Sequence, residues 1–259
     1  RVSRKCRTGE SYGAKAAASH TGAMAGSQRV FEAVVRQCGI IATDDPDEFI
    51  DLAFALSYLP LPRGRRVAVV TMGGGWGVVA ADEVARSDLV LAELPEEALT
   101  EIDRVLPPYW SRANPVDLVG TMKDGAAEKA LEVVVRSDAV DAVVVLGVIG
   151  MVTSPLRVIE EVKRVQKRSG LYVGGSLPDP ERYRFREGDF IKWVSELMRA
   201  YQKPIINVSV RPIERAVFGE GGPYSTVVLP SPLRSVRVIA KMCRYQAFLE
   251  RLGAGEANG

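Results

Sequence analysis

From Val67 onward, short runs of hydrophobic residues alternate with longer stretches that are hydrophobic at every third or fourth position. Continuous short runs are typical of strands buried on both faces of a parallel sheet, and the longer stretches are typical of amphipathic helices. The predicted strands are Val67–Val70, Leu89–Ala92, Ala142–Leu146, Ile205–Val208 and Thr226–Leu229. This pattern predicts an α/β domain, a doubly wound parallel sheet with flavodoxin-like strand order.

Helices are predicted between and after these strands. One follows the first strand and ends near Arg86, a second covers Ser154–Lys167, and the last covers Pro232–Leu252. We expect the tail, residues 254–259, to be disordered, because chain ends without packing partners lack order.

The first part of the chain has helical periodicity. A helix is predicted from Ser27 to Cys38, with Gly39 placed to end it and with Val30, Val34, Val35 and Cys38 on one face. A second helix begins at Pro46 after an aspartate cap and ends at Pro60. Its expected buried face consists of Phe49, Leu52, Ala53, Leu56 and Leu59.

The stretch Leu61–Arg66 has prolines, a glycine and charges but no periodicity, so it is interpreted as a linker. We therefore divide the chain into residues 1–64, which form part of one domain, and residues 65–253, which form a complete α/β domain. We expect the second unit to fold without the first, because it is about the size of an ordinary domain.

Composition narrows the function classes. The chain has 34 Lys and Arg against 32 Asp and Glu, which does not indicate a nucleic-acid-binding or membrane-binding surface. Its cysteines, Cys6, Cys38 and Cys243, form no CxxC motif, so neither a zinc site nor a disulfide framework is predicted. We expect a cytoplasmic protein. Because the first residue is Arg, we also expect a processed chain or a fragment.

The single histidine, His20, is the strongest candidate for chemistry. It stands among the small residues Ser19, Thr21 and Gly22, which offer little bulk to bury an imidazole and let a ligand approach closely. A nucleophilic nitrogen in an open loop suits covalent phosphoryl transfer. The alternative is a structural histidine. A zinc pair is disfavoured because no second histidine exists.

The second candidate is a glycine-rich segment that follows the first strand and opens a helix. Its residues are Gly73, Gly74, Gly75, Trp76 and Gly77. Free backbone amides at a helix N-terminus make a phosphate site, and ligands of open α/β sheets bind at the carboxyl ends of strands. The alternatives are a tight turn without a ligand and a partial dinucleotide fingerprint with Glu93 as the ribose-binding acid. Val78 stands where that fingerprint requires its third glycine.

The third candidate is the polar turn around Pro115, where Asn114 and Asp117 flank a rigid proline. These side chains either orient groups near the glycine-rich segment or only satisfy their own turn.

These motifs, in this order, resemble the ADP-forming (NDP-forming) acyl-CoA synthetases, in particular the alpha subunit of acetyl-CoA synthetase, within the succinyl-CoA synthetase-like superfamily. The residues that carry the resemblance are Ala16–Gly26, Val69–Thr71 with Gly74, Gly75 and Gly77, and Asn114–Leu118. It implies that His20 is phosphorylated and passes the phosphoryl group between an acyl phosphate and ADP. It also implies that the helix beginning at Gly73–Gly77 faces that phosphate.

The resemblance implies coenzyme A, ATP or ADP, and Mg²⁺ as cofactors, the last two bound mainly by domains outside this chain. It implies a small carboxylic acid as substrate. As partners it implies an ATP-grasp beta subunit or domain and a CoA-binding domain that precedes Arg1, in a hetero-oligomer or multidomain assembly.

Residues 1–64 then form the C-terminal part of the phosphohistidine-bearing CoA-ligase domain, and the chain alone is expected to be inactive. Two other functions stay open: a non-catalytic regulatory or assembly module, and a dinucleotide-binding oxidoreductase domain.

Overall fold

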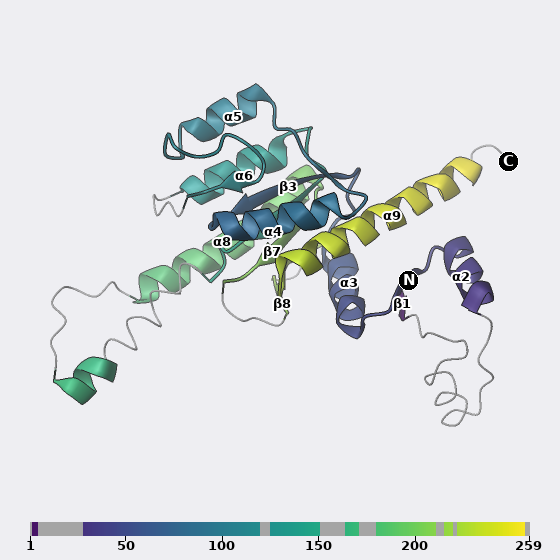
Figure 1. The fold of residues 1–259 in the computed structure, drawn as a ribbon, viewed down its shortest axis with the longest axis horizontal. Helices are drawn as coiled ribbons and strands as arrows, with labels where there is room; N and C mark the ends of the chain where they lie inside the picture. The colour runs from purple at the N-terminus through teal and green to yellow at the C-terminus, as the bar shows by residue number, and fades with distance from the viewer. Residues whose placement is uncertain are drawn as a thin grey trace.

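A computed structural model describes residues 2–4, 28–119, 125–150, 164–170, 180–210, 215–219 and 222–256 of the chain. These residues form a mixed α/β fold in which helices surround one seven-stranded sheet (Figure 1). The strands of this sheet are β3 (Arg66–Thr71), β4 (Val90–Leu91), β5 (Val116–Asp117), β6 (Ala142–Leu146), β7 (Ile205–Val208), β8 (Ala216–Phe218) and β9 (Thr226–Leu229). The helices around it are α3 (Pro46–Tyr58), α4 (Gly74–Ala85), α5 (Glu96–Asp103), α6 (Ala126–Arg136), α8 (Pro180–Tyr201) and α9 (Pro232–Glu256).

The strand order confirms the flavodoxin-like prediction. The sheet is ordered β4-β3-β6-β7-β9-β8, and all neighbours are parallel except β8, which runs antiparallel to β9. After β3 the chain adds β4 on one side and later β6 on the other. The strand order therefore reverses between β3 and β6, where ligands of open α/β sheets bind.

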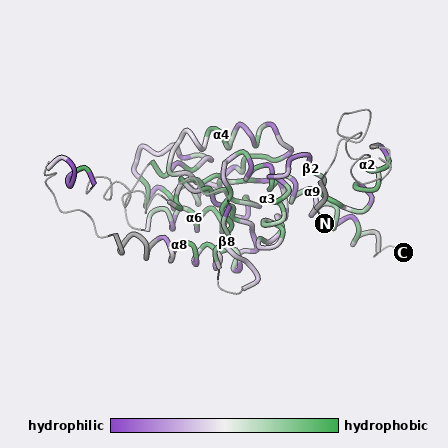
Figure 2. Tube along the Cα trace, turned by 90° about the horizontal axis from the view of Figure 1, so that it is seen from below, coloured by the Kyte–Doolittle hydropathy of each residue, from purple (hydrophilic) through white to green (hydrophobic). Residues whose placement is uncertain are grey.

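Helices cover both faces of the sheet. Helix α9 packs against both α3 and α4 on one face, while α6 packs against α5 and α8 on the other. Figure 2 shows hydrophobic positions concentrated between these layers. The central strands are almost entirely buried, since β6, β7 and β9 consist only of buried residues. Burial on both faces explains why these strands are continuous hydrophobic runs.

The edge of the sheet beside β3 is split between two short strands. β4 pairs with the first two residues of β3, and β5 pairs with its last two, Val70 and Thr71. Ala68 and Val69, in the middle of β3, pair with neither of these strands, and the Val69 N–H donates to the side chain of Asn114 instead.

Residues before α3 form a second, smaller group. Strand β1 (Val2–Arg4) pairs in parallel with β2 (Ile41–Thr43), and α2 (Gln28–Gln37) lies between them in sequence. Helix α2 ends just before Gly39, as predicted, and Gly39 has a φ of +61°. The predicted apolar face of α2 is largely exposed to solvent, since Val30 is 62% and Val34 45% exposed.

Helix α3 joins this group to the main sheet. Asp45 is its N-cap, accepting a hydrogen bond from the Asp47 N–H, and Pro46 begins the helix as predicted. Its Leu52, Ala55 and Leu59 belong to the same hydrophobic core as the sheet. The predicted burial of Ala53 is wrong, because Ala53 is exposed and Asp51 is buried in its place.

Two arginines explain the buried Asp51. Its Oδ1 accepts a 2.7 Å hydrogen bond from Arg215 Nε, and its Oδ2 accepts one of 2.5 Å from Arg234 Nε. Arg215 directly precedes β8, and Arg234 lies in the first turn of α9. A buried carboxylate is tolerated when it is paired and hydrogen-bonded, so Asp51 ties α3 to the main sheet.

The remaining differences concern element ends and omissions. Helix α9 continues to Glu256, past the predicted end at Leu252, so the expectation that the tail is disordered from residue 254 is wrong for residues 254–256. The predicted helix Ser154–Lys167 falls largely outside the described residues. The sequence pattern does not predict helices α5, α6 and α8 or strands β1, β2, β5 and β8.

Candidate functional site at the carboxyl edge of the sheet

The glycine-rich segment lies where the strand order reverses. Strand β3 ends at Thr71, and α4 begins at Gly74 with Gly73 as its N-cap. Beside it, the Met72 N–H donates a 2.9 Å hydrogen bond to the carbonyl of Leu146, the last residue of β6. The start of α4 is thus adjacent to the carboxyl ends of both strands that flank the reversal point.

Thr71 fixes the turn into α4. Its buried side-chain hydroxyl donates a 2.8 Å hydrogen bond to the Gly73 carbonyl and accepts one of 3.1 Å from the Gly73 N–H. Gly74 and Gly75 follow in the first helical turn, and their own N–H groups have no acceptor within the helix, whereas the next N–H, that of Trp76, donates to the Gly73 carbonyl. Gly74 and Gly75 are both exposed, so their donors face a region that a ligand can reach. Such donors, together with the helix dipole, attract anions.

The glycines of the segment serve different purposes. A Cβ added at Gly73 or Gly75 would meet no atom within 4 Å, whereas one at Gly77 would lie 3.0 Å from Thr71 Cγ2 and 3.2 Å from Pro115 Cβ. None of the segment's glycines is among the described residues with positive φ, so left-handed backbone does not require them. Gly77 permits close packing of helix on strand, and Gly73 and Gly75 leave open space.

Asp117 lies over the first turn of α4. Its Oδ2 is 2.7 Å from the position of a Cβ added at Gly74, and its Oδ1 accepts a 2.8 Å hydrogen bond from the Val119 N–H. A carboxylate is electrostatically favourable at a helix N-terminus. Asp117 therefore lies beside the glycine-rich segment, and its role toward a bound phosphate stays a prediction.

Asn114 has a structural role at the split edge. Its Oδ1 accepts a 2.9 Å hydrogen bond from the Val69 N–H, and its Nδ2 donates to the carbonyls of Val67 and Ala92 at 2.9 and 3.0 Å. The side chain thereby fills the gap that β4 and β5 leave on β3. Asn114 positions the turn that carries Asp117, and it makes these bonds to neighbouring strands rather than to its own turn.

Sequence reasoning missed the turn after β6. Gly147 has a φ of +79°, and a Cβ added there would lie 3.1 Å from Val210 Cγ1 and 3.4 Å from Met72 Cβ. Only glycine adopts this conformation without strain and allows this approach. The available signal was a glycine directly after a continuous hydrophobic run.

The geometry weakens the dinucleotide alternative. In that fingerprint the third glycine allows close packing of helix on strand. Here Gly77 makes the close approach, while Val78 at the third position is 61% exposed. Within the described ranges, no group of three or more His, Cys, Asp and Glu side chains is placed to hold a metal ion.

Comparison with known proteins identifies the domains. Residues 6–56 match the model of the succinyl-CoA ligase like flavodoxin domain, and residues 67–170 match the model of the Ligase-CoA domain. The chain carries CoA-ligase domains. The first match includes His20, and the second includes the glycine-rich segment, Asn114 and Asp117.

Relatives of these CoA-ligase domains are ADP-forming ligases. The chain is 33% identical over 172 residues to the alpha subunit of acetate–CoA ligase (ADP-forming) II of Pyrococcus furiosus, covering 63% of this chain and 37% of that protein. It is 39% identical over 158 residues to the alpha subunit of isoform I of the same organism, covering 61% and 34%. The chain therefore spans little more than a third of these relatives.

A solved structure is also similar. The acetyl-coenzyme A synthetase 1 of Ca. Korarchaeum cryptofilum, in complex with phosphate and ADP, superimposes with a TM-score of 0.63 at 26% identity. The match covers 91% of this chain and 45% of that one. The resemblance noted from the motifs is confirmed.

The remaining candidate residues of the CoA-ligase domains lie outside the described part of the chain. These residues are Ser19, His20, Thr21 and Gly22. Their placement relative to the glycine-rich segment stays a prediction. Among the described helices, none combines the length and apolar character needed to cross a membrane.

Proposed function

We propose that this chain is part of an ADP-forming acyl-CoA synthetase that uses His20 as a phosphoryl carrier. The observation that carries the proposal is the exposed first turn of α4, which presents backbone donors at the reversal point of a Ligase-CoA domain. The names of the similar proteins support the reaction class, because they include ADP-forming acetate–CoA ligases.

The proposed reaction has three steps. Phosphate displaces coenzyme A from an acyl-CoA and gives an acyl phosphate. The imidazole of His20 then takes the phosphoryl group and releases the carboxylic acid. Finally, ADP takes the phosphoryl group from the phosphohistidine and leaves as ATP, and the reverse sequence activates the acid.

The described residues contribute to binding and positioning. In this proposal the N–H groups at the start of α4 bind the phosphoryl oxygens, and Thr71 holds the turn that presents them. Gly75 leaves the space into which the phosphoryl group fits. Asn114 keeps Asp117 beside the same helical turn.

The other components come from partners. ATP or ADP with Mg²⁺ binds to an ATP-grasp subunit or domain, and coenzyme A binds to a separate CoA-binding domain. The chain alone is therefore inactive in this proposal and works in a hetero-oligomer or a longer polypeptide, where a small carboxylic acid is the substrate.

Phosphorylation of the assembled enzyme tests the proposal. After incubation with γ-labelled ATP and Mg²⁺, we expect acid-labile, base-stable label on this chain, and none on the His20→Ala variant. Because His20 is the only histidine of the chain, no other imidazole can take its place. Arg104→Ala, an exposed position outside the candidate site, is the control and should keep the label. Absence of label on the wild type, or label on His20→Ala, would favour a non-catalytic module.

A further inference from the structure

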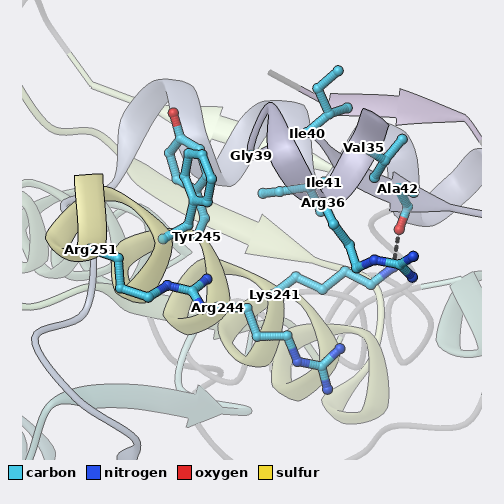
Figure 3. A pocket seen from close by; sticks show the side chains of 11 residues that line it. Val35, Arg36, Gly39, Ile40, Ile41, Ala42, Lys241, Arg244, Tyr245 and Arg251 are labelled. Atoms are coloured by element: carbon cyan, nitrogen blue, oxygen red, sulfur yellow. Dashed lines mark hydrogen bonds between the residues drawn. The ribbon is translucent and has the colours of Figure 1, made fainter. Parts of the chain in front are cut away.

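A cavity of about 380 Å³ lies away from the glycine-rich segment, between the first group of elements and α9 (Figure 3). One wall comes from the end of α2, the turn at Gly39 and the start of β2. The other comes from residues of α9 at helical spacing, Lys241, Arg244, Tyr245, Phe248 and Arg251. Its volume is within the range of pockets that hold small molecules.

The lining combines positive charge with apolar surface. Every charged side chain in it is basic, and the apolar part includes Val35, Ile40 and Phe248. The Phe248 ring lies against Gly39, where an added Cβ would be 2.0 Å from ring carbon Cε1. Figure 3 shows Arg36 and Lys241 at one end of the lining and Arg251 at the other. The cavity therefore suits a molecule with an anionic group and an apolar or planar body.

Two of the cations already have acidic partners. Lys241 Nζ donates a 2.6 Å hydrogen bond to Glu48 and one of 3.3 Å to the Ala42 carbonyl, and Arg244 makes two 3.0 Å bonds to Asp88. These hydrogen bonds from Arg244 lower the pKa of Asp88, so that pair stays ionised at neutral pH.

The other two cations are available. Arg36 and Arg251 are exposed and have no ion pair with another residue in the described part of the chain. Lys241 also occupies the Ala42 carbonyl on the edge of β2, which hinders an additional strand from pairing there. A small ligand fits this lining better than an added strand does.

We propose that this cavity binds a phosphate-bearing small molecule, with Arg36 holding the phosphate at one end and Tyr245, Phe248 and Arg251 contacting its apolar or planar part. Guanidinium groups hold phosphate through paired, charge-assisted hydrogen bonds. The cavity shares no lining residue with the glycine-rich segment.

Calorimetric titration of the chain with ADP, at low and moderate salt, tests the proposal. We expect saturable binding that weakens as salt rises. Arg36→Ala should weaken it by about 10–100-fold, the loss expected for charge-assisted hydrogen bonds. Arg251→Ala should weaken it less, because this side chain contacts the planar part of the ligand and not the phosphate. Both side chains are exposed, so both variants should fold. Arg104→Ala removes an exposed arginine outside the cavity and should change nothing.

Further measurements distinguish a nucleotide from free phosphate as the ligand. They also distinguish binding in the cavity from phosphoryl transfer at His20. If a nucleotide is the ligand, Tyr245→Ala should weaken ADP binding but not the binding of inorganic phosphate. If free phosphate is the ligand, phosphate should bind as tightly as ADP and Tyr245→Ala should have no effect on either. His20→Ala should bind ADP normally here even though it loses phosphorylation. The assignment would be overturned if neither ADP nor phosphate binds at millimolar concentration, or if both arginine variants bind ADP with wild-type affinity.

Discussion

At the scale of single residues, neighbouring glycines in one segment differ in what they allow. Gly77 is buried against Thr71 and Pro115, whereas the position of a Cβ on Gly75 is open. Side-chain volume at Gly77 therefore affects folding, and side-chain volume at Gly75 affects what approaches the helix N-terminus.

These two positions give a matched pair of variants. Gly77→Ala should lower the free energy of unfolding by about 1–3 kcal/mol, because its methyl group overpacks the helix–strand contact. Gly75→Ala should keep or raise it, since alanine is favoured over glycine within a helix by about 0.5–1 kcal/mol. In the assembled enzyme, Gly75→Ala should nevertheless slow phosphoryl transfer. Urea denaturation and the labelling assay measure the two effects, and full transfer activity of a stable Gly75→Ala would remove the segment from the site.

Asn114 gives a second prediction at this scale. Asn114→Ala removes hydrogen bonds to three backbone groups, including the buried Val69 N–H, and should cost about 2–4 kcal/mol of stability. Ser111→Ala, an exposed position of the same turn, is the control and should be nearly neutral. Equal midpoints in urea for both variants would show that the side chain does not hold the split edge.

At the scale of elements, ionic contacts attach α3 to the sheet. Asp51 is fully buried, and its partners Arg215 and Arg234 come from distant parts of the sequence. Removing the buried carboxylate leaves Arg234 without its close partner and Arg215 with Asp47 alone, which is more costly than losing an exposed pair.

Asp51→Asn should therefore destabilise the protein by about 3–5 kcal/mol. Asp47→Asn is the matched control on the same helix. Asp47 also pairs with Arg215, but its side chain is 64% exposed, so the cost should stay below about 1 kcal/mol. Chemical denaturation of both variants measures the difference. Similar losses would mean that burial of Asp51 contributes little.

The elements also show which parts of the fold the sequence predicts. Strands β6, β7 and β9 were predicted with their observed ends, because burial on both faces leaves an uninterrupted hydrophobic run. β5 has two residues and β8 three half-buried ones, so neither produces a recognisable period. Periodicity places Ala53 and not Asp51 on the buried face, because the burial of Asp51 depends on arginines that are distant in sequence. The glycine-rich segment was recognisable, but the contact of Asp117 with Gly74 depends on tertiary structure.

At the scale of the whole molecule, the folding unit and the family matches divide the chain differently. The two matches leave a gap at residues 57–66, close to the expected boundary at 64/65. The hydrophobic core, however, includes Leu52, Ala55 and Leu59 of α3. A domain that begins at Arg65 lacks this helix and leaves the core side chains beneath it exposed to water.

We therefore expect a fragment beginning at Arg65 to be less stable than one beginning at Ile41, which retains β2 and α3. Leu52 and Ala55 are fully buried, and burying a leucine side chain contributes about 1.5–3 kcal/mol. The Arg65 fragment also loses Asp51, which leaves Arg215 and Arg234 without their carboxylate. It should bind a hydrophobic dye and unfold at lower urea concentration, while its circular dichroism retains α/β character. Equal urea unfolding midpoints for the two fragments would show that the folding boundary lies in the linker and that α3 is a peripheral helix.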